Sequence, residues 1–377
     1  MNKRKIINDP VYDGFLSVDD GVILSVIEHP WFQRQRRIKQ LGLTCLVYPG
    51  AMHTRFSHML GALNLMGRAL ETLRMKGVEI TDEECRGAKL AILLHDIGHG
   101  PFSHTSEHIL VDLAHEEITL MMMRRMNEEM HGALDVAIDI FRNDYPKHFL
   151  HQLVSSQLDM DRLDYLGRDS FFTGVSEGIV GTDRIISMLN VHDDELVVDE
   201  KGIYSVEKFI ISRRLMYWQV YMHKTVIAAD QLLLGILRRA RELGLSPFTF
   251  SSSTFDLDRF AEVDDDDIMV AVKHWQHSDD EVLSTLSRCL VGRRLPAIRL
   301  SNEPFVGIQS TYFEGTGELH NRSYDFNDQE IKVLYKDGRC LPISEASDQL
   351  DRRFLEKQVV KYYHYFPKTT VNYRLIG

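Results

Sequence analysis

Residues 91–101, which read AILLHDIGHGP, are the stretch that decides the fold. Four apolar residues are followed directly by a histidine and an aspartate, and two glycines and a proline then end the helix. The apolar run predicts that the last turn of this helix is buried. His95 and Asp96 are therefore expected at an interior helix end, where two adjacent titratable side chains are hard to explain as ordinary packing.

The sequence before this stretch predicts two helices. Thr81 and Glu84 form a capping box that opens the helix ending at His95. Residues 53–76 carry apolar residues at three- and four-residue spacing, and Gly77 supplies the stop. Both patterns favour a mostly α fold.

The sequence after it continues the helical pattern to about residue 245. Residues 149–168 are expected to form one helix, and residues 207–243 one long helix or two with a kink. Between them, residues 190–206 read as a β-hairpin, with two short β-like runs flanking an acidic turn that contains glycine.

The composition changes after Gly244. The acidic run 264–267 suits a helix N-terminus. Further on, polar turns separate short β-rich runs at residues 331–335, 359–365 and 369–373. We therefore expect a catalytic body over residues 1–245, with its core at about 50–170, and a smaller mixed α+β C-terminal lobe over residues 246–377 that serves oligomerisation or regulation.

Composition limits the class of protein. The 377 residues carry a formal net charge of −11, which disfavours indiscriminate binding to nucleic acid. No apolar stretch approaches the roughly 18 residues of a membrane span, and the basic N-terminus has no apolar region behind it. The four cysteines are scattered without a Cys-x-x-Cys pair, which indicates reduced thiols. The expected location is the cytoplasm, without membrane contact.

Four side chains stand out as candidate metal ligands: His58, His95, Asp96 and Asp161. A hard divalent ion that activates water needs imidazole and carboxylate ligands and open positions for water and substrate. In the expected 149–168 helix, Asp161 shares a face with Val154, Leu158 and Tyr165, where a carboxylate is costly unless a cation meets it. Any one of the four alone is more often a core residue or a cap.

Five longer stretches of sequence indicate a more specific class of protein. They are residues 8–10 (NDP), 31–42 (WFQRQRRIKQLG), 48–58 (YPGAMHTRFSH), 95–104 (HDIGHGPFSH) and 159–169 (DMDRLDYLGRD). With the four candidate ligands, they resemble the dNTP triphosphohydrolases of the HD superfamily, over about residues 5–225. The resemblance implies an HD-domain helical bundle and hydrolysis of deoxynucleoside triphosphates to deoxynucleoside and inorganic triphosphate, in the manner of a dGTPase.

The resemblance also implies roles for individual residues. One divalent ion, with Mn, Fe, Mg, Zn and Ni all compatible, would be held by His58, His95, Asp96 and Asp161. The implied catalytic residues beside Asp161 are His104 and His115, as proton donors, and Glu116, which would orient them. The implied substrate-binding residues are Gln40, Leu41, Arg55, Arg162, Tyr165, Asp169, Arg213, Tyr217, Tyr221 and Lys224.

Two of these assignments also have a physical rationale: the arginines as phosphate contacts, and the set of residues on the expected long helix. A nucleoside triphosphate carries about four negative charges and calls for several cations, for which arginine is best suited. Arg213, Tyr217 and Lys224 fall at i, i+4 and i+11, on one face of the expected long helix. Core packing or a solvated basic stripe is the alternative interpretation of these residues.

The resemblance further implies a guanine nucleotide activator bound between subunits of a dimer or tetramer. Its contacts match Glu28, Gln33 and Arg36, with Arg293 from the C-terminal lobe. A surface amphipathic helix explains the first three equally well. Two other functions stay open: an HD phosphohydrolase acting on a monophosphate, cyclic nucleotide or alarmone, and a non-catalytic module that binds nucleotide or single-stranded nucleic acid.

Overall fold

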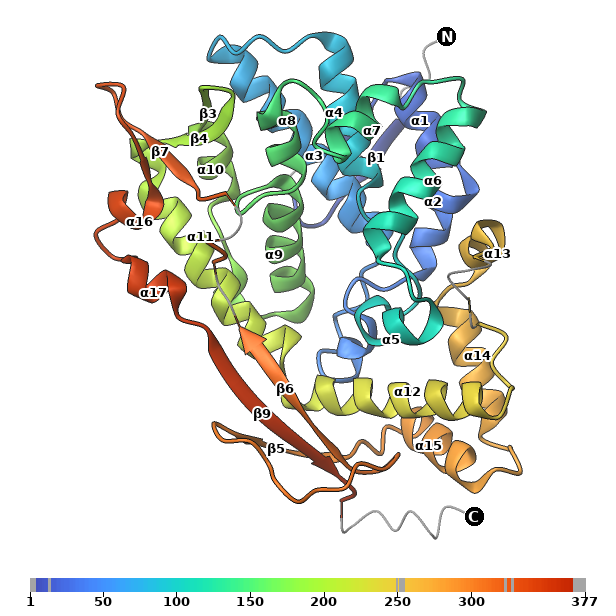
Figure 1. Ribbon diagram of the computed structural model, residues 1–377. Helices are drawn as coiled ribbons and strands as arrows, with labels where there is room; N and C mark the ends of the chain where they lie inside the picture. Colours follow the sequence, from blue (N-terminus) through green and yellow to red (C-terminus); the bar gives the residue numbers. More distant parts are fainter. Residues whose placement is uncertain are drawn as a thin grey trace.

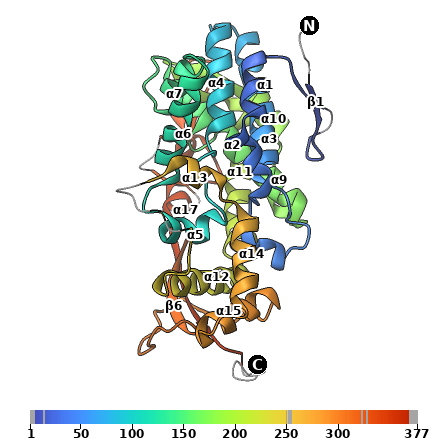
Figure 2. The same ribbon diagram turned by 90° about the vertical axis from the view of Figure 1, so that its right-hand side faces the viewer.

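The computed structural model describes residues 5–12, 15–248, 250, 255–321, 324–326 and 329–368, apart from the side chains of residues 104, 107 and 108. Figure 1 shows a helical body with the strands of the C-terminal part along one side, and Figure 2 shows the body edge-on, with the N-terminal strand at its margin. The fold is mostly helical with a smaller strand-containing C-terminal region, as the sequence predicts.

The helices of the first part are α1 (Gly21–Glu28), α2 (Pro30–Arg34), α3 (Arg55–Met75), α4 (Asp82–Leu94), α5 (Ser103–Leu110), α6 (His115–Glu129), α7 (Asp135–Phe141), α8 (His148–Val154), α9 (Met160–Thr173), α10 (Thr182–Met188), α11 (Ile203–Met216) and α12 (Lys224–Glu242). The later helices are α13 (Leu257–Glu262), α14 (Asp265–Trp275), α15 (Glu281–Val291), α16 (Ile343–Ala346) and α17 (Arg352–Glu356). Short 3-10 turns cover Gln35–Arg37, Gly42–Leu46, Ser176–Gly178 and Glu200–Gly202.

Within the described residues, the strands form three small sheets. They are β1 (Lys5–Asn8), β2 (Phe15–Val18), β3 (Leu189–His192), β4 (Glu195–Asp199), β5 (Ala297–Ser301), β6 (Gly315–Asn321), β7 (Lys332–Leu334), β8 (Cys340–Pro342) and β9 (Val359–Phe366). The sheet orders are β1-β2, β3-β4-β7-β8 and β5-β9-β6. All pairs are antiparallel except β4 with β7.

Helix α3 lies at the centre of the body and packs against α4 and α9. Several of its apolar residues, among them Leu65, Met66 and Leu70, have no exposed surface. The capping box that opens α4 is present: the Thr81 amide donates to Glu84 (2.8 Å) and the Glu84 amide to the Thr81 hydroxyl (3.1 Å). These local signals place His95 at the C-terminal end of α4, as predicted.

The predicted helix over residues 149–168 is wrong. The chain breaks after α8, and Asp159 caps α9 by accepting a hydrogen bond from the Arg162 amide (2.7 Å). Asp161 therefore lies in the first turn of α9, and it shares no helix face with Val154 or Leu158.

The kinked form of the 207–243 prediction is confirmed. Helix α11 runs into a π-helical turn, Tyr217–Tyr221, and α12 leaves it at an angle of 55°. Lys224 is the first residue of α12, so the expectation that it continues the face of Arg213 and Tyr217 is wrong. The described residues include no single helix both long and apolar enough to cross a bilayer; only the bent pair Glu200–Tyr221 and Lys224–Glu242 reaches that length and composition.

The hairpin exists, but its turn is at Asp193 and Asp194, which both have positive φ, rather than at Gly202. Helix α14 begins at the acidic run, with Asp264 as its cap. The strands near residues 331–335 and 359–365 are present, whereas 369–373 lies outside the described residues. The β4–β7 pairing joins segments on either side of residue 245, and the two-lobe division stays a prediction.

Candidate active site

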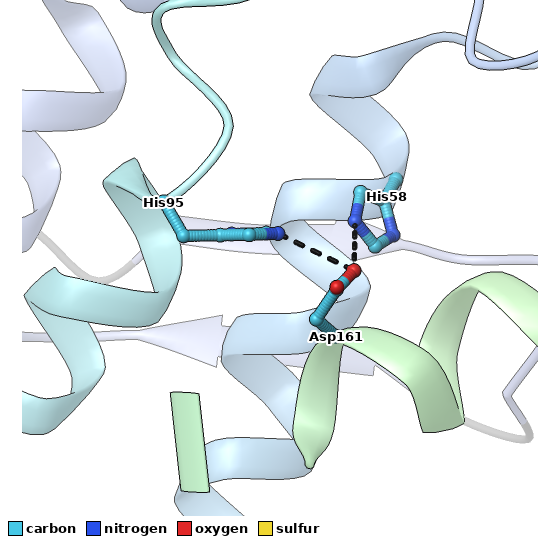
Figure 3. A group of neighbouring side chains, drawn as sticks. All are labelled: His58, His95 and Asp161. Carbon is cyan, nitrogen blue, oxygen red and sulfur yellow. Dashed lines mark ion pairs between the residues drawn. The ribbon is translucent and has the colours of Figure 1, made fainter. Parts of the chain in front are cut away.

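Three side chains from three helices meet inside the body. His58 comes from α3, His95 from the end of α4 and Asp161 from the first turn of α9 (Figure 3). One oxygen of Asp161 lies 3.1 Å from Nε2 of His58 and 3.3 Å from Nε2 of His95. One ligand atom from each residue lies within 4.8 Å of the other two, so the group could hold a metal ion.

The hydrogen bonds of the two imidazoles prepare them as ligands. Nδ1 of His58 lies 2.8 Å from Asp164, and Nδ1 of His95 lies 2.6 Å from the carbonyl oxygen of Ile92. Since both of those partners accept, each Nδ1 carries the proton, and each Nε2 is left facing Asp161. Both Nε2 atoms are buried, and neither has a hydrogen-bond partner among the described residues. This donor set fits a divalent cation.

Asp96 lies beside this group. Its carboxylate is 3.4 Å from Nε2 of His95 and 3.7 Å from Nε2 of His58, and it also receives a hydrogen bond from Arg55 (2.5 Å). Arg55 is buried and donates a second hydrogen bond, of 2.6 Å, to Ser103. Asp96 as fourth ligand and Arg55 as a phosphate contact both stay predictions.

The electrostatics of the group favour positive charge at its centre. Burial alone would lower the pKa of His58, but the adjacent carboxylates of Asp161 and Asp164 outweigh it and raise that pKa to about 10. Burial would raise the pKa of Asp161, yet His95 and His58 hold it well below its usual range. A metal ion bound here would take the place of the imidazole protons, because a ligating histidine must be neutral.

Aromatic and basic side chains lie next to the metal group. Tyr165 is one helical turn beyond Asp161; burial raises the pKa of its phenol, and Arg213, Tyr217 and Arg162 are close enough to influence that pKa. Arg162 binds Asp159 (2.8 Å). The Nε atoms of Arg162 and Arg213 are buried, and no hydrogen-bond partner for either lies within the described part of the chain. Two guanidinium groups thus offer donors toward the same region.

Asp169 is held at the next turn of α9. Its two oxygens bind Nε2 of His53 and the hydroxyl of Tyr221, each at 2.7 Å. The ring of Tyr221 lies edge-on to that of Tyr165, with centroids 6.2 Å apart. His53 was not among the predicted site residues, although it lies in the quoted string 48–58 and directly precedes the cap of α3.

A pair of histidines, His99 and His115, lies beside Asp96. Nε2 of His99 is 3.3 Å from the Asp96 carboxylate, and the ring of His115 stacks on that of His99 at 3.9 Å. Glu116 lies beside His115, at 3.2 Å from its Nε2. The side chain of His104, predicted as a second proton donor, lies outside the described residues.

For three predicted substrate residues, no hydrogen bond within the described part of the structure defines a role. The amide oxygen of Gln40 is buried and has no hydrogen-bond partner among the described residues, while Leu41 packs on the core. Lys224 is exposed at the start of α12.

The predicted effector residues lie on separate elements. Gln33 accepts a hydrogen bond from Arg36 (2.8 Å), whose guanidinium stacks on the Phe56 ring at 3.5 Å. Glu28 binds Lys5 (3.1 Å), and Arg293 donates to the carbonyl oxygen of Leu46 (2.7 Å). Their common role stays a prediction.

Comparison with known proteins gives the family. Residues 55–167 match the HD domain, and residues 180–301 match the HD associated region. A solved phosphohydrolase structure from Bacteroides thetaiotaomicron is 48% identical, with a TM-score of 0.92 over 97% of this chain and 100% of that one. The chain belongs to the HD-domain phosphohydrolase family. The family resemblance seen in the sequence is therefore confirmed.

Other relatives of this HD-domain protein are more distant. The protein YwfO of Bacillus subtilis is 35% identical over 78% of this chain and 72% of its own length. A Dictyostelium discoideum protein named as a deoxynucleoside triphosphate triphosphohydrolase, a SAMHD1 homolog, is 32% identical over 58% of this chain and 46% of its own length. The chain thus spans about half of the latter relative.

Proposed function

We propose that this HD-domain protein is a metal-dependent triphosphohydrolase that converts deoxynucleoside triphosphates to deoxynucleoside and inorganic triphosphate. The observation that carries the proposal is the group of His58, His95 and Asp161 with Arg162 and Arg213 beside it. The activity for which the Dictyostelium relative is named supports the same substrate class.

His58, His95 and Asp161, with Asp96 beside them, would hold one divalent ion. Bound there, the ion would lower the pKa of a water molecule and polarise the phosphoryl group that this water attacks. Imidazole with carboxylate suits Mn, Fe, Mg, Zn or Ni alike.

The chain's own residues would bind and orient the substrate. A triphosphate needs several cations, and the unpaired Nε donors of Arg162 and Arg213 supply charge-assisted hydrogen bonds. Tyr165, held between Tyr221 and the arginines, would lie against the deoxyribose and exclude a 2′-hydroxyl by its bulk. Asp169 is positioned by His53 and Tyr221 to accept from the sugar region.

Breaking the bond between the α-phosphorus and the 5′ oxygen requires a proton on the leaving deoxynucleoside. His115 would supply it, since an imidazole titrates near neutral pH, and Glu116 would orient its ring. Water supplies the oxygen that remains on triphosphate.

Product identification tests the proposal. Purified protein, treated with EDTA and reloaded with single metals, is assayed on all four dNTPs and the ribonucleotides, with and without GTP. Metal-dependent release of intact triphosphate from dNTPs is expected, and stimulation by GTP would support an effector site at Glu28, Gln33 and Arg36. Release of orthophosphate alone, or turnover of monophosphates only, would favour another HD phosphohydrolase. DNA binding without turnover would favour a binding module.

A further inference from the structure

A chain of buried hydrogen bonds leads from the metal group to the N-terminal segment. Asp164 on α9 lies 2.8 Å from Nδ1 of His58, and its other oxygen accepts the Tyr12 hydroxyl at 2.7 Å. Arg168 donates to both oxygens of Asp164, at 2.8 and 3.0 Å. The same guanidinium also binds both oxygens of Asp9, at 2.6 and 3.2 Å.

The part of this hydrogen-bond network that lies next to His58 is fully paired. Asp164 and Arg168 are fully buried, and a buried charge is tolerated only when it is paired and hydrogen-bonded. Every oxygen of Asp164 has two donors, so the carboxylate cannot turn without breaking several bonds. Such a carboxylate fixes the ring of His58 rather than merely filling space.

Gly61 makes this arrangement possible. It lies on α3 one turn after His58, where α3 crosses α9. A Cβ at Gly61 would lie 2.0 Å from an Asp164 oxygen and 2.2 Å from an Arg168 nitrogen. Only glycine lets the pair approach the imidazole this closely.

We propose that Asp164 is a positioning residue for the metal ligand His58, and that Arg168, Asp9 and Tyr12 hold Asp164 in place. Donation of Nδ1–H to a carboxylate leaves Nε2 available to the ion and makes the imidazole a stronger ligand. The inference rests on the metal site of the proposed function. It makes residues 9–12 of the N-terminal segment part of that site.

Metal affinity of the full chain tests the proposal. The dissociation constants of Mn²⁺ and Zn²⁺ are measured by competition with a chromophoric chelator. Asp164→Asn should weaken both by about 10- to 100-fold, the usual effect of removing such a partner. Tyr12→Phe, which removes one hydrogen bond and keeps the ring, should weaken them by a smaller factor. Wild-type affinity in Asp164→Asn overturns the proposal, whereas a wild-type chain that binds no metal overturns the metal site itself.

A matched pair of glycine substitutions separates positioning from helix stability. Alanine is the better helix former at both Gly61 and Gly67 of α3. A Cβ at Gly67 would meet only Lys89, at 3.5 Å, which is ordinary contact. Gly61→Ala should therefore lose metal affinity while Gly67→Ala keeps it, with thermal melting as the check on folding. Equal affinity in the two variants overturns the proposal, and Tyr12→Phe keeps it testable if Gly61→Ala does not fold.

If Asp9 and Tyr12 strengthen metal binding, then bound metal must in turn stabilise the N-terminal segment, because coupling between two sites is reciprocal. Addition of Mn²⁺ should slow amide hydrogen exchange in residues 5–12 of the wild type, and Asp164→Asn should abolish this effect. Exchange in the wild type that does not respond to bound metal would overturn the role of Asp9 and Tyr12.

Discussion

Gly98→Ala tests how closely the loop after His95 must approach α6. The Gly98 amide donates to the Thr119 hydroxyl (3.0 Å). An added Cβ would lie 2.3 Å from the carbonyl oxygen of His115 and 2.3 Å from the amide nitrogen of Thr119, where ordinary contact begins near 3.4 Å. Both are backbone atoms, so the loop and the first turn of α6 would have to separate by about 1 Å.

That separation moves His115 away from the metal group. A misplacement of about 1 Å can cost 10²-fold in rate, so kcat for triphosphate release should fall by about that factor. Overpacking typically costs about 1–3 kcal/mol, which should lower the urea midpoint. Gly100→Ala is the control, because its Cβ would lie 3.5 Å from the Phe260 ring. If the two variants match in both kcat and midpoint, the close backbone contact at Gly98 does not position His115.

Three further substitutions address the ligands, the phosphate contact and a partly buried carboxylate. Asp161→Ala should remove most of the bound metal and all metal-dependent activity, and full metal content by elemental analysis would place the site elsewhere. Arg213→Ala should lower kcat/KM by about 10- to 100-fold through the loss of a charge-assisted hydrogen bond worth about 1.5–3 kcal/mol; unchanged kinetics would mean that Arg213 does not meet substrate. Burial raises the pKa of Asp230 from 3.8 to about 6, so its neutral form favours the folded state and this stability is lost as pH rises through that range. Asp230→Asn should accordingly stabilise the protein at pH 7.5 by up to about 3 kcal/mol, with little gain at pH 4; an equal difference in urea midpoint at both pH values would contradict the assignment.

The elements that local signals specify were predictable from the sequence. The capping box at Thr81 and the glycines after Asp96 fix where α4 begins and ends without help from tertiary contacts. His58, His95 and Asp161 could be grouped because the sequence strings around them resemble those of the HD superfamily. The apolar helix that ends in a His-Asp pair indicates a site at His95, but it does not by itself select His58 or Asp161. The structure brings these three together.

The breaks between helices were harder to predict from the sequence. No glycine or proline separates α8 from α9 or interrupts the π-helical turn before α12, so the apolar pattern continues through both. The first break depends on Asp159, whose side chain binds the amides of Ser156 and Arg162. Such hydrogen bonds offer the backbone an alternative to helix continuation, and the residue pattern alone does not show which of the two is adopted.

Asp164 and His53 were missed for a related reason. In sequence, Asp164 is an ordinary acidic residue on an amphipathic helix, and only the crossing at Gly61 shows that it points at His58. The signal was present as a pair: a glycine one turn after a candidate ligand on one helix, and an Asp-Arg pair at i and i+4 on another. Neither half is informative before α3 and α9 are known to be neighbours.

The same crossing explains why so many charges are tolerated inside the body. His58, Asp164 and Arg168 are fully buried, and each is hydrogen-bonded to a neighbour. Among the described residues, the ion pairs of Asp161 are those with the imidazoles of His58 and His95. A cation that binds the folded chain but not the unfolded one stabilises it by about 2.7 kcal/mol at a concentration 100 times its dissociation constant. An ion held by His58, His95 and Asp161 would therefore stabilise the fold as well as serve the proposed reaction.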